Sequence, residues 1–308
     1  MQLETSVSLL NQGETRQSHA TCGKASPCIC CGTAAWKPKF RILMECGQCG
    51  FIRADVDATP EQIKRLYQED YFRGAEYGNY LEDQATHRTN FEWRFRMIKR
   101  LAPNLKSIFE IGCAYGFWLE CCTKHHLVSA GVDVCEAAIE HARRELGQDA
   151  RADDFLSMDF PPGKFEAFCM WDTIEHLSNP EDFVARAYEL LPENGWLFLT
   201  TGDIGSRMAR WRGPRWRLIH PPTHLQYFSL DTMDRFLARH GFQTVNQQTQ
   251  SMYRNIGEVL GRVSTLGRGV TRWSAKTLTK VVPSALQQRG FWLDFGDIMF
   301  IAARKIAS

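Results

Sequence analysis

Two short cysteine motifs lie near the start of the chain, at positions 28–32 and 46–50, and each places two residues between its cysteines and a glycine directly after them. Two intervening residues let a tight turn aim both sulfurs at one ion, and the glycine frees backbone N–H groups to bond to sulfur. Because four thiolates leave no open position for water, we expect a structural Zn²⁺ rather than a catalytic one. The predicted ligands are Cys28, Cys31, Cys46 and Cys49.

The other cysteines leave alternatives to this ligand set. Cys30 could replace a neighbour within its motif, Cys22 is a spare thiol nearby, and the whole cluster could consist of reduced thiols without a metal. Six of the eleven cysteines fall between positions 22 and 49, a crowding that favours metal binding over disulfides under reducing conditions. Apolar and aromatic residues between the motifs predict a short hairpin that carries the second motif.

A glycine-rich turn is the second feature whose residues could take part in ligand binding or catalysis. A predicted strand over Ser107–Ile111 leads into Gly112 and Gly116, and helix-like sequence follows over 117–125. A glycine turn between a strand and a helix lets a ligand approach the backbone closely beside the helix N-terminus. Glu110, just before the turn, suits an ammonium group and would repel a pyrophosphate.

Asp133 ends the next predicted strand, which covers Val128–Val134. An acid at that place can accept hydrogen bonds from both ribose hydroxyls of a nucleoside. From these residues alone, NAD and S-adenosylmethionine both remain open as ligands. The alternation of strand-like and helix-like segments from about residue 105 predicts an α/β fold with a doubly wound sheet.

Composition sets wider limits. Charged residues make up 23% of the chain and the formal net charge is +2, so the chain is not broadly basic. No segment approaches the roughly 20 apolar residues that span a bilayer. The polar residues 1–21 lack the apolar core of a signal peptide, so we expect a flexible leader and a cytoplasmic protein.

The segment from Glu110 to Gly116 resembles motif I of the class I S-adenosylmethionine-dependent methyltransferases. The resemblance extends to the strand-four motif at 168–177 and to the glycine turn at 190–197, and it covers roughly residues 60–305. It implies a Rossmann-like seven-stranded methyltransferase sheet with strand order 3-2-1-4-5-7-6 and an antiparallel last strand near Asp297–Ala303. The cofactor residues that it implies are Tyr71, Tyr80, Glu110, Gly112, Cys113, Gly116, Asp133, Asp154, Phe155, Trp171 and Asp172.

The closest subgroup, small-molecule and sugar methyltransferases, also begins with two such cysteine motifs and an aromatic-rich helical stretch. The resemblance divides the chain into a zinc-ribbon-like module at 22–58, a helical linker or cofactor lid at 59–104 and a catalytic domain at 105–308. In the linker, Tyr71 and Tyr80 would close over the methionine end of the cofactor, unless they only pack the linker against the domain.

Transfer of a methyl group requires an aligned acceptor and, for an alcohol or carbon acid, a base. His224 lies between a predicted fifth strand and a Tyr-Phe-Ser turn, and it is the leading candidate base; the alternative is a capping or packing histidine. Tyr227 is a weaker candidate. His176 follows the fourth strand, where a structural or cofactor-side role is an equal alternative.

Two basic segments could recognise an acceptor or a surface. Residues 207–217 hold five arginines and two tryptophans, which could grip the phosphate of a nucleotide-linked or lipid-linked sugar or of RNA, or could form a mobile lid. The insertion at 252–290 predicts basic amphipathic helices, which suit peripheral contact with an anionic membrane, a dimer interface or a lid.

The leading function is therefore methyl transfer from S-adenosylmethionine to a small-molecule acceptor, such as a phosphorylated or lipid-linked sugar. An RNA methyltransferase is one alternative, although strand four ends in Trp171-Asp172-Thr173-Ile174 rather than the Asn-Pro-Pro-Tyr type of motif used on exocyclic amines. A non-catalytic scaffold that binds the cofactor is the other.

Overall fold

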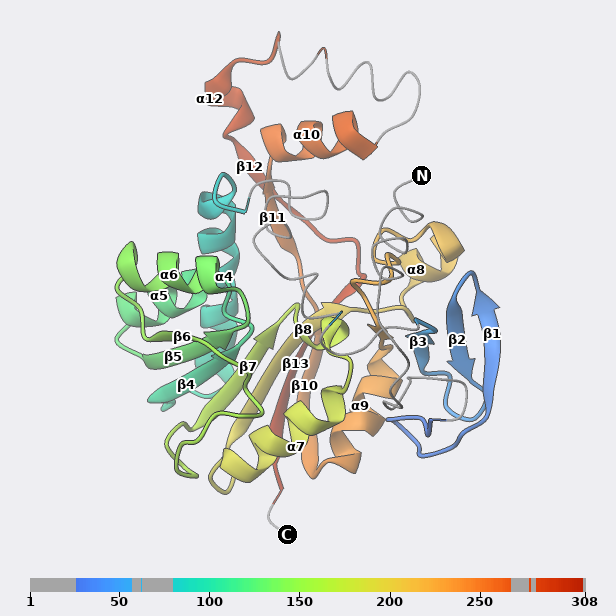
Figure 1. Ribbon diagram of the computed structural model, residues 1–308. Helices are drawn as coiled ribbons and strands as arrows, with labels where there is room; N and C mark the ends of the chain where they lie inside the picture. Colours follow the sequence, from blue (N-terminus) through green and yellow to red (C-terminus); the bar gives the residue numbers. More distant parts are fainter. Residues whose placement is uncertain (1–25, 57–61, 63–79, 267–276, 278–280, 307–308) are drawn as a thin grey trace.

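A seven-stranded sheet forms the centre of the computed structural model, which describes residues 26–56, 62, 80–266, 277 and 281–306 (Figure 1). Its order is β10-β13-β8-β7-β4-β5-β6; β13 is antiparallel to both neighbours and the remaining pairs are parallel. This confirms the predicted α/β class and strand order. The strands are β4 (Ser107–Ile111), β5 (Val128–Asp133), β6 (Ala150–Ala152), β7 (Ala167–Trp171), β8 (Trp196–Gly202), β10 (Phe242–Thr249) and β13 (Ile298–Lys305).

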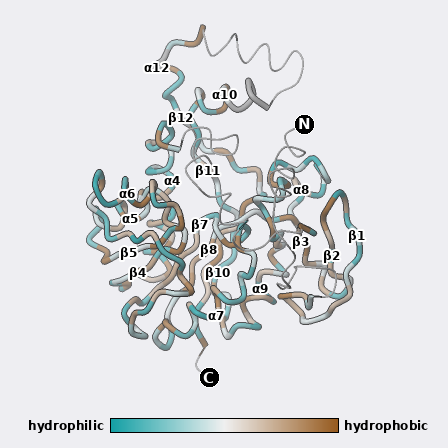
Figure 2. Tube along the Cα trace, viewed as in Figure 1, coloured by the Kyte–Doolittle hydropathy of each residue, from teal (hydrophilic) through white to brown (hydrophobic). Residues whose placement is uncertain are grey.

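Helices cover both faces of this sheet, which explains why its central strands are apolar on both sides. In β7, Phe168 and Met170 face one core while Cys169 and Trp171 face the other. The hydrophobic segments in Figure 2 accordingly follow the central strands. On one face lie α4 (Gln84–Leu101), α5 (Phe117–Lys124) and α6 (Glu136–Arg144); on the other lie α7 (Pro180–Leu190) and α9 (Leu230–Arg239).

The cysteine module forms a second sheet with a strand from the catalytic domain. The expected hairpin consists of β1 (Trp36–Phe40) and β2 (Leu43–Cys46), followed by β3 (Ile52–Ala54). The fourth strand is β9 (Gln226–Tyr227), which pairs antiparallel with β3. The module is therefore continuous with the catalytic domain, and its buried cysteines share one hydrophobic core with α7 and α9.

The insertion after β10 is built on an antiparallel ribbon that the sequence did not predict. β11 (Met252–Asn255) pairs with β12 (Gly290–Leu293), and the ribbon carries α10 (Ile256–Leu266) and α12 (Ser284–Gln287), as Figure 1 shows. All four β11 residues are half-buried, so no apolar alternation marks the strand. Asn90 of α4 anchors it, because its Oδ1 accepts from the Tyr253 amide at 2.8 Å. Residues 267–276 and 278–280 lie outside the described ranges.

The arginine-rich segment is helical and is anchored at its C-terminal end, and its alternative role as a lid stays a prediction. It forms α8 (Arg207–Arg212) and a 3₁₀ turn, η2 (Gly213–Arg215). Buried Asp297 accepts hydrogen bonds from Trp216 Nε1 at 2.8 Å and from Arg217 Nη2 at 2.7 Å. Trp211, in contrast, is 76% exposed. Within the described ranges, no helix is long and apolar enough to cross a membrane.

Candidate active site

The glycine turn lies at the carboxyl end of β4, against the segment that follows β7. Gly112 and Gly116 have φ of +80° and +78°, a conformation that glycine adopts without steric cost. A Cβ on Gly112 would lie 2.6 Å from Thr173 Oγ1, and one on Gly116 would lie 2.8 Å from Ala142 Cβ. Both positions therefore exclude a side chain, because Thr173 and Ala142 pack closely against the turn.

Asp133 stands beside this turn and helps to shape it. Its Oδ2 accepts from the Ala114 amide and its Oδ1 from the Cys135 amide, both at 2.9 Å. Burial raises the pKa of the carboxyl group, and these amide bonds oppose the rise. Each carboxylate oxygen can accept more than one hydrogen bond, so contact with ribose hydroxyls stays a compatible prediction.

Glu110 is a buried acid directly before the turn. Its Oε2 has no hydrogen-bond partner among the described residues. Burial raises its pKa well above the usual range; the charge of Asp133 adds to the rise, and Arg94 opposes it. A buried carboxylate oxygen without a partner fits an incoming ammonium group, which is the chemistry at the methionine end of S-adenosylmethionine.

The remaining predicted cofactor residues divide into cleft and core positions. Tyr80 stacks on His87 with ring centroids 3.9 Å apart and on Tyr115 at 5.4 Å, beside the turn. Tyr71 lies outside the described residues. Asp154 is half-buried and its Oδ1 accepts from the Leu156 amide at 3.0 Å. The rest, Cys113, Phe155 and Trp171, are buried.

Cofactor binding by Phe155 and Trp171 stays a prediction, and the rings of both residues pack inside the protein. Phe155 packs against Phe168 and Phe109, and Trp171 packs against Trp118 and Phe300. The ring of Phe155 is part of one hydrophobic core and the ring of Trp171 is part of the other, where they pack against the ends of the strands.

Arg94 of α4 is a site residue that sequence reasoning missed. It is buried, and its Nη2 lies 2.6 Å from Oδ2 of Asp172, the acid directly after β7. Burial alone would raise the pKa of Asp172, but the guanidinium outweighs it and holds that pKa below its usual range. A signal existed in the sequence, because Arg94 falls in the apolar stripe formed by Phe91, Phe95 and Ile98.

A buried cluster of Glu175, His176 and His224 lies on the other side of Asp172. One ligand atom from each lies within 4.8 Å of the others. The rings of His176 and His224 have centroids 4.6 Å apart, and His220 lies 3.8 Å from His224 by the same measure. The structure thus brings together two of the predicted catalytic residues, His176 and His224. It adds Glu175, which precedes His176 in the 3₁₀ turn η1 (Ile174–His176).

Hydrogen bonds define the protonation of this cluster. His176 Nδ1 lies 2.9 Å from the Thr223 carbonyl, which can only accept, so Nδ1 carries the proton and Nε2 is the basic nitrogen of the neutral ring. Tyr227 is buried, and its hydroxyl donates to the His224 carbonyl at 3.0 Å. Tyr227 therefore supports the backbone of His224, and its predicted role as a base stays a prediction.

The environment shifts the pKa values of the cluster in opposite directions. Burial, with the neighbouring charges of His176 and His220, holds the pKa of His224 well below its usual range. Burial and the charge of Asp172 raise the pKa of Glu175 to about 8. The lowered pKa of His224 favours its neutral imidazole, which is the form that a base requires, and it also makes that imidazole a weaker base. A carboxylate with two imidazoles could also hold a divalent transition metal.

One segment, Asp172–His176, joins the two sides of this site. Thr173 packs on Gly112 of the cofactor turn, while Glu175 and His176 enter the histidine cluster. Asp172 has a φ of +54°, which is unusual outside glycine and reverses the chain between those contacts. A ligand on the glycine turn would therefore face the histidine cluster across this segment.

The four cysteines predicted to bind zinc also lie together, within 4.8 Å of one another by their sulfur atoms. The Sγ atoms of Cys28 and Cys49 are 3.5 Å apart, and those of Cys31 and Cys46 are 3.6 Å apart. A tetrahedron with Zn–S bonds of about 2.3 Å has edges of about 3.8 Å, so the arrangement fits the ion. Cys30 stands outside this group, and Cys22 lies outside the described residues.

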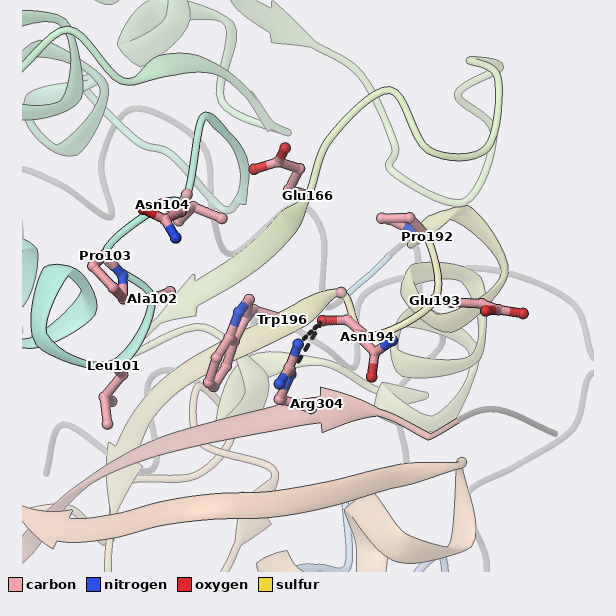
Figure 3. A pocket seen from close by; sticks show the side chains of 12 residues that line it. Leu101, Ala102, Pro103, Asn104, Glu166, Pro192, Glu193, Asn194, Trp196 and Arg304 are labelled. Atoms are coloured by element: carbon pink, nitrogen blue, oxygen red, sulfur yellow. Dashed lines mark hydrogen bonds between the residues drawn. The ribbon is translucent and has the colours of Figure 1, made fainter.

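The pocket in Figure 3 belongs to a different part of the molecule. It has a volume of about 490 Å³ and is lined by the segments that precede β4, β7 and β8. Arg304 fills one side, where it donates to the Asn194 carbonyl at 3.2 Å and covers Trp196. Because parallel α/β sheets bind ligands at the carboxyl ends of their strands, we do not place the cofactor in this pocket.

Comparisons with known proteins agree with the geometry. Residues 80–247 match the family described as a methyltransferase domain. The ubiquinone biosynthesis O-methyltransferase of Thiobacillus denitrificans is 27% identical over 115 residues, which make up 35% of this chain and 50% of that protein. The mitochondrial enzyme of the same name from Candida albicans is 27% identical over 155 residues, 47% of this chain and 41% of that protein. The chain thus spans about half the length of these relatives.

Solved structures share the fold. A SAM-dependent methyltransferase from Archaeoglobus fulgidus is 18% identical with a TM-score of 0.50, over 74% of this chain and all of that one. A SAM-dependent methyltransferase from Thermotoga maritima is 17% identical with a TM-score of 0.50, over 77% of this chain and 99% of that one. With the family match over more than half of its length, the chain belongs to the methyltransferase domain family and has the class I fold of S-adenosylmethionine-dependent methyltransferases.

Proposed function

We propose that the chain transfers the methyl group of S-adenosylmethionine to a hydroxyl group of a small-molecule acceptor. The observation that carries this proposal is the Asp172–His176 segment, which packs on the glycine turn at one end and enters a buried histidine cluster at the other. Such an arrangement suits an in-line displacement, because donor and acceptor must meet end to end at one carbon.

On the cofactor side, S-adenosylmethionine supplies an electrophilic methyl group. Gly112 and Gly116 let the turn adopt the positive φ that places it at the end of β4, and the free Oε2 of Glu110 suits the ammonium group. Asp133 would accept the ribose hydroxyls, and Tyr80 stacks near the start of α5, where it could cover the methionine end.

On the acceptor side, a hydroxyl group must lose its proton as the new bond forms. His224 is 8% exposed and stands beside His176, so it is placed to accept that proton in a site shielded from water, with the imidazolium stabilised only once the acceptor is bound. His176 is held through Nδ1 by the Thr223 carbonyl, which fixes its ring beside that of His224. The relatives are named for O-methyl transfer, which supports a hydroxyl group over nitrogen or carbon.

Arginine side chains favour an acceptor that carries negative charge. Arg207, Arg210, Arg212 and Arg215 of α8 and η2 are exposed, and the loop with His220 and His224 follows them in the chain. Guanidinium groups bind phosphate through two parallel hydrogen bonds. This supports a phosphorylated or lipid-linked acceptor. Contact of the 252–290 insertion with a membrane remains a prediction.

The test uses S-adenosylmethionine with a tritiated methyl group, incubated with the purified protein and separate lipid, small-molecule, RNA and protein fractions of a native extract. We expect label in the lipid or small-molecule fraction. We expect His224→Ala to lower this label about 100-fold or more, in line with the loss of a general base. His240→Ala, which removes a histidine at the end of α9, is the matched control and should leave labelling near the parent level.

Each alternative function has its own outcome. Label confined to RNA would overturn the small-molecule proposal in favour of an RNA methyltransferase. Cofactor binding without label in any fraction would favour the non-catalytic scaffold. Equal labelling by the parent and by His224→Ala would remove His224 from the mechanism.

A further inference from the structure

We propose that the four-cysteine site positions the histidine cluster, so that a metal bound by Cys28, Cys31, Cys46 and Cys49 sets the geometry of the acceptor side alone. The structural part of this inference stands without the proposed function, and only its effect on turnover rests on that function. It follows from a continuous path of backbone contacts between the second cysteine motif and His224.

The path begins where the second cysteine motif closes onto β3. The Gly50 amide donates to the Cys46 carbonyl at 2.9 Å, and the Cys46 amide donates to the Phe51 carbonyl at 2.8 Å. Phe51 is buried, and its ring lies 5.0 Å from that of Phe228, which directly follows β9. The position of the Cys46 and Cys49 sulfurs is thus linked to the first residues of β3.

The second step is the pairing of β3 with β9. Ile52 is opposite Tyr227 and Arg53 is opposite Gln226. One residue further along, the Ala54 amide donates to the Leu225 carbonyl at 2.8 Å. Arg53 is itself fixed, because it is buried and its guanidinium covers the Trp36 ring at 4.0 Å. The residues immediately after His224 therefore belong to the sheet of the cysteine module.

The third step connects these residues to the other half of the cluster. The Leu225 amide donates to the Glu175 carbonyl at 2.8 Å, and Gln226 Nε2 donates to the Leu177 carbonyl at 3.0 Å. Leu225 thus bridges β3 and η1 through its two backbone groups. Since His224 precedes Leu225, movement of β3 would displace His224 relative to Glu175 and His176.

The cofactor side is reached from β3 only indirectly, through the Asp172–His176 segment and the contact of Thr173 with Gly112. In the part of the chain that the structure describes, β3 pairs only with β2 and β9, whereas the glycine turn rests on β5, Thr173 and Ala142. Loss of the metal should therefore disturb the acceptor cluster and spare the cofactor site. A module that only recruits a partner would disturb neither.

The experiment compares Cys49→Ser with Cys30→Ser in the full-length protein. The second variant removes a buried thiol of the same module that lies outside the ligand group. For each variant we would measure zinc content, amide hydrogen exchange at 225–227, exchange of the C2 hydrogens of His176 and His224, and S-adenosylmethionine affinity. Ala54→Pro serves as a second variant, because it removes the amide that donates to Leu225 while it retains all four cysteines.

We expect Cys49→Ser to lose zinc and to exchange its 225–227 amides about tenfold faster or more, with faster C2 exchange at both histidines. Its cofactor affinity should stay within about twofold of the parent, because β3 reaches the glycine turn only indirectly, through the Asp172–His176 segment. Ala54→Pro should loosen the same amides with zinc retained, and Cys30→Ser should behave as the parent.

Three results would overturn the inference: a parent protein without bound metal, unchanged exchange at 225–227 after metal loss, or an equal loss of cofactor affinity. If exchange rises as expected while the parent transfers no methyl group to any acceptor, the positioning role stands and the proposed function fails. The two claims are therefore separable.

Discussion

The two sides of the candidate site are built in different ways. The cofactor side comes from one stretch of chain, Glu110–Asp133, at the ends of two neighbouring parallel strands. The acceptor side joins residues that are far apart, since His176 and Thr223 are separated by 47 positions and β3 comes from the cysteine module. A local motif thus fixes one side, while long-range packing fixes the other, and Arg94 with the Asp172–His176 segment lies between them.

Arg94→Leu should have the largest effect, because it removes the cation shared by both sides. It leaves Asp172, whose side chain is 30% exposed, without its ion-pair partner, and we expect a loss of about 3 kcal/mol of folding free energy at pH 8. Chemical denaturation measures this loss. Arg88→Leu, on the same helix but in a partly exposed pair with Glu120, should cost less than about 1 kcal/mol. Similar costs for the two variants would remove Arg94 from the centre of the site.

The substitution Glu175→Gln tests the acceptor side through the pH dependence of folding stability. The folded-state pKa of Glu175 is raised from 4.5 to about 8, so the protonated acid stabilises the parent at low pH and this contribution is lost as pH rises through 8. Glutamine does not titrate, so the stability of the variant does not fall with pH in this way. Its stability relative to the parent should increase by about 3 kcal/mol between pH 5 and pH 8, as urea unfolding would show. Glu189→Gln, at an exposed position, should show no such trend; a flat difference for Glu175→Gln would contradict the assignment.

Asp133→Ala tests the cofactor side alone. We expect S-adenosylmethionine to bind about 100-fold more weakly by calorimetry, a loss of about 2.7 kcal/mol. Asp133→Asn, which keeps the shape and one acceptor oxygen, should lose less. Zinc content and hydrogen exchange at 225–227 should stay at the parent level in both variants. Parent-like affinity in Asp133→Ala would refute the ribose assignment.

Gly112→Ala against Gly163→Ala gives the smallest expected difference. Both glycines have φ near +80°, so both substitutions carry similar backbone strain. An added Cβ meets Thr173 at position 112 but has nothing within 4 Å at position 163. Gly112→Ala should therefore be less stable by about 1 to 2 kcal/mol in thermal unfolding and should also bind the cofactor more weakly. Equal stability of the two variants would mean that Thr173 does not press on the turn.

The same contrast explains what could be predicted from the sequence. The strands that lead to Gly112 and Asp133 followed from a local pattern, the strand order followed from the resemblance to class I methyltransferases, and the structure reproduces both. The cluster of four cysteines could also be predicted, because the two residues between the cysteines of each motif are a local feature of the sequence. In each case the residues that define the feature are close together in the chain.

The missed features depend on contacts between distant segments. β9 has only two residues, too few for an alternation of apolar and polar side chains, so its pairing with β3 could not be predicted from the sequence. The burial of Phe155 and Trp171 came from aromatic neighbours on other elements, which motif matching does not reveal. Glu175 belongs to the site because the 220–224 loop places His224 beside it, and the sequence does not reveal this long-range contact.

The most direct test of the proposed methyl transfer is a crystal structure with S-adenosylhomocysteine, the product that would remain after transfer. We predict ribose hydroxyls on Asp133, the amino group near Glu110, and the sulfur facing Glu175, His176 and His224. A ligand with its sulfur directed away from this cluster, or bound instead in the pocket beside Trp196 and Arg304, would contradict the account.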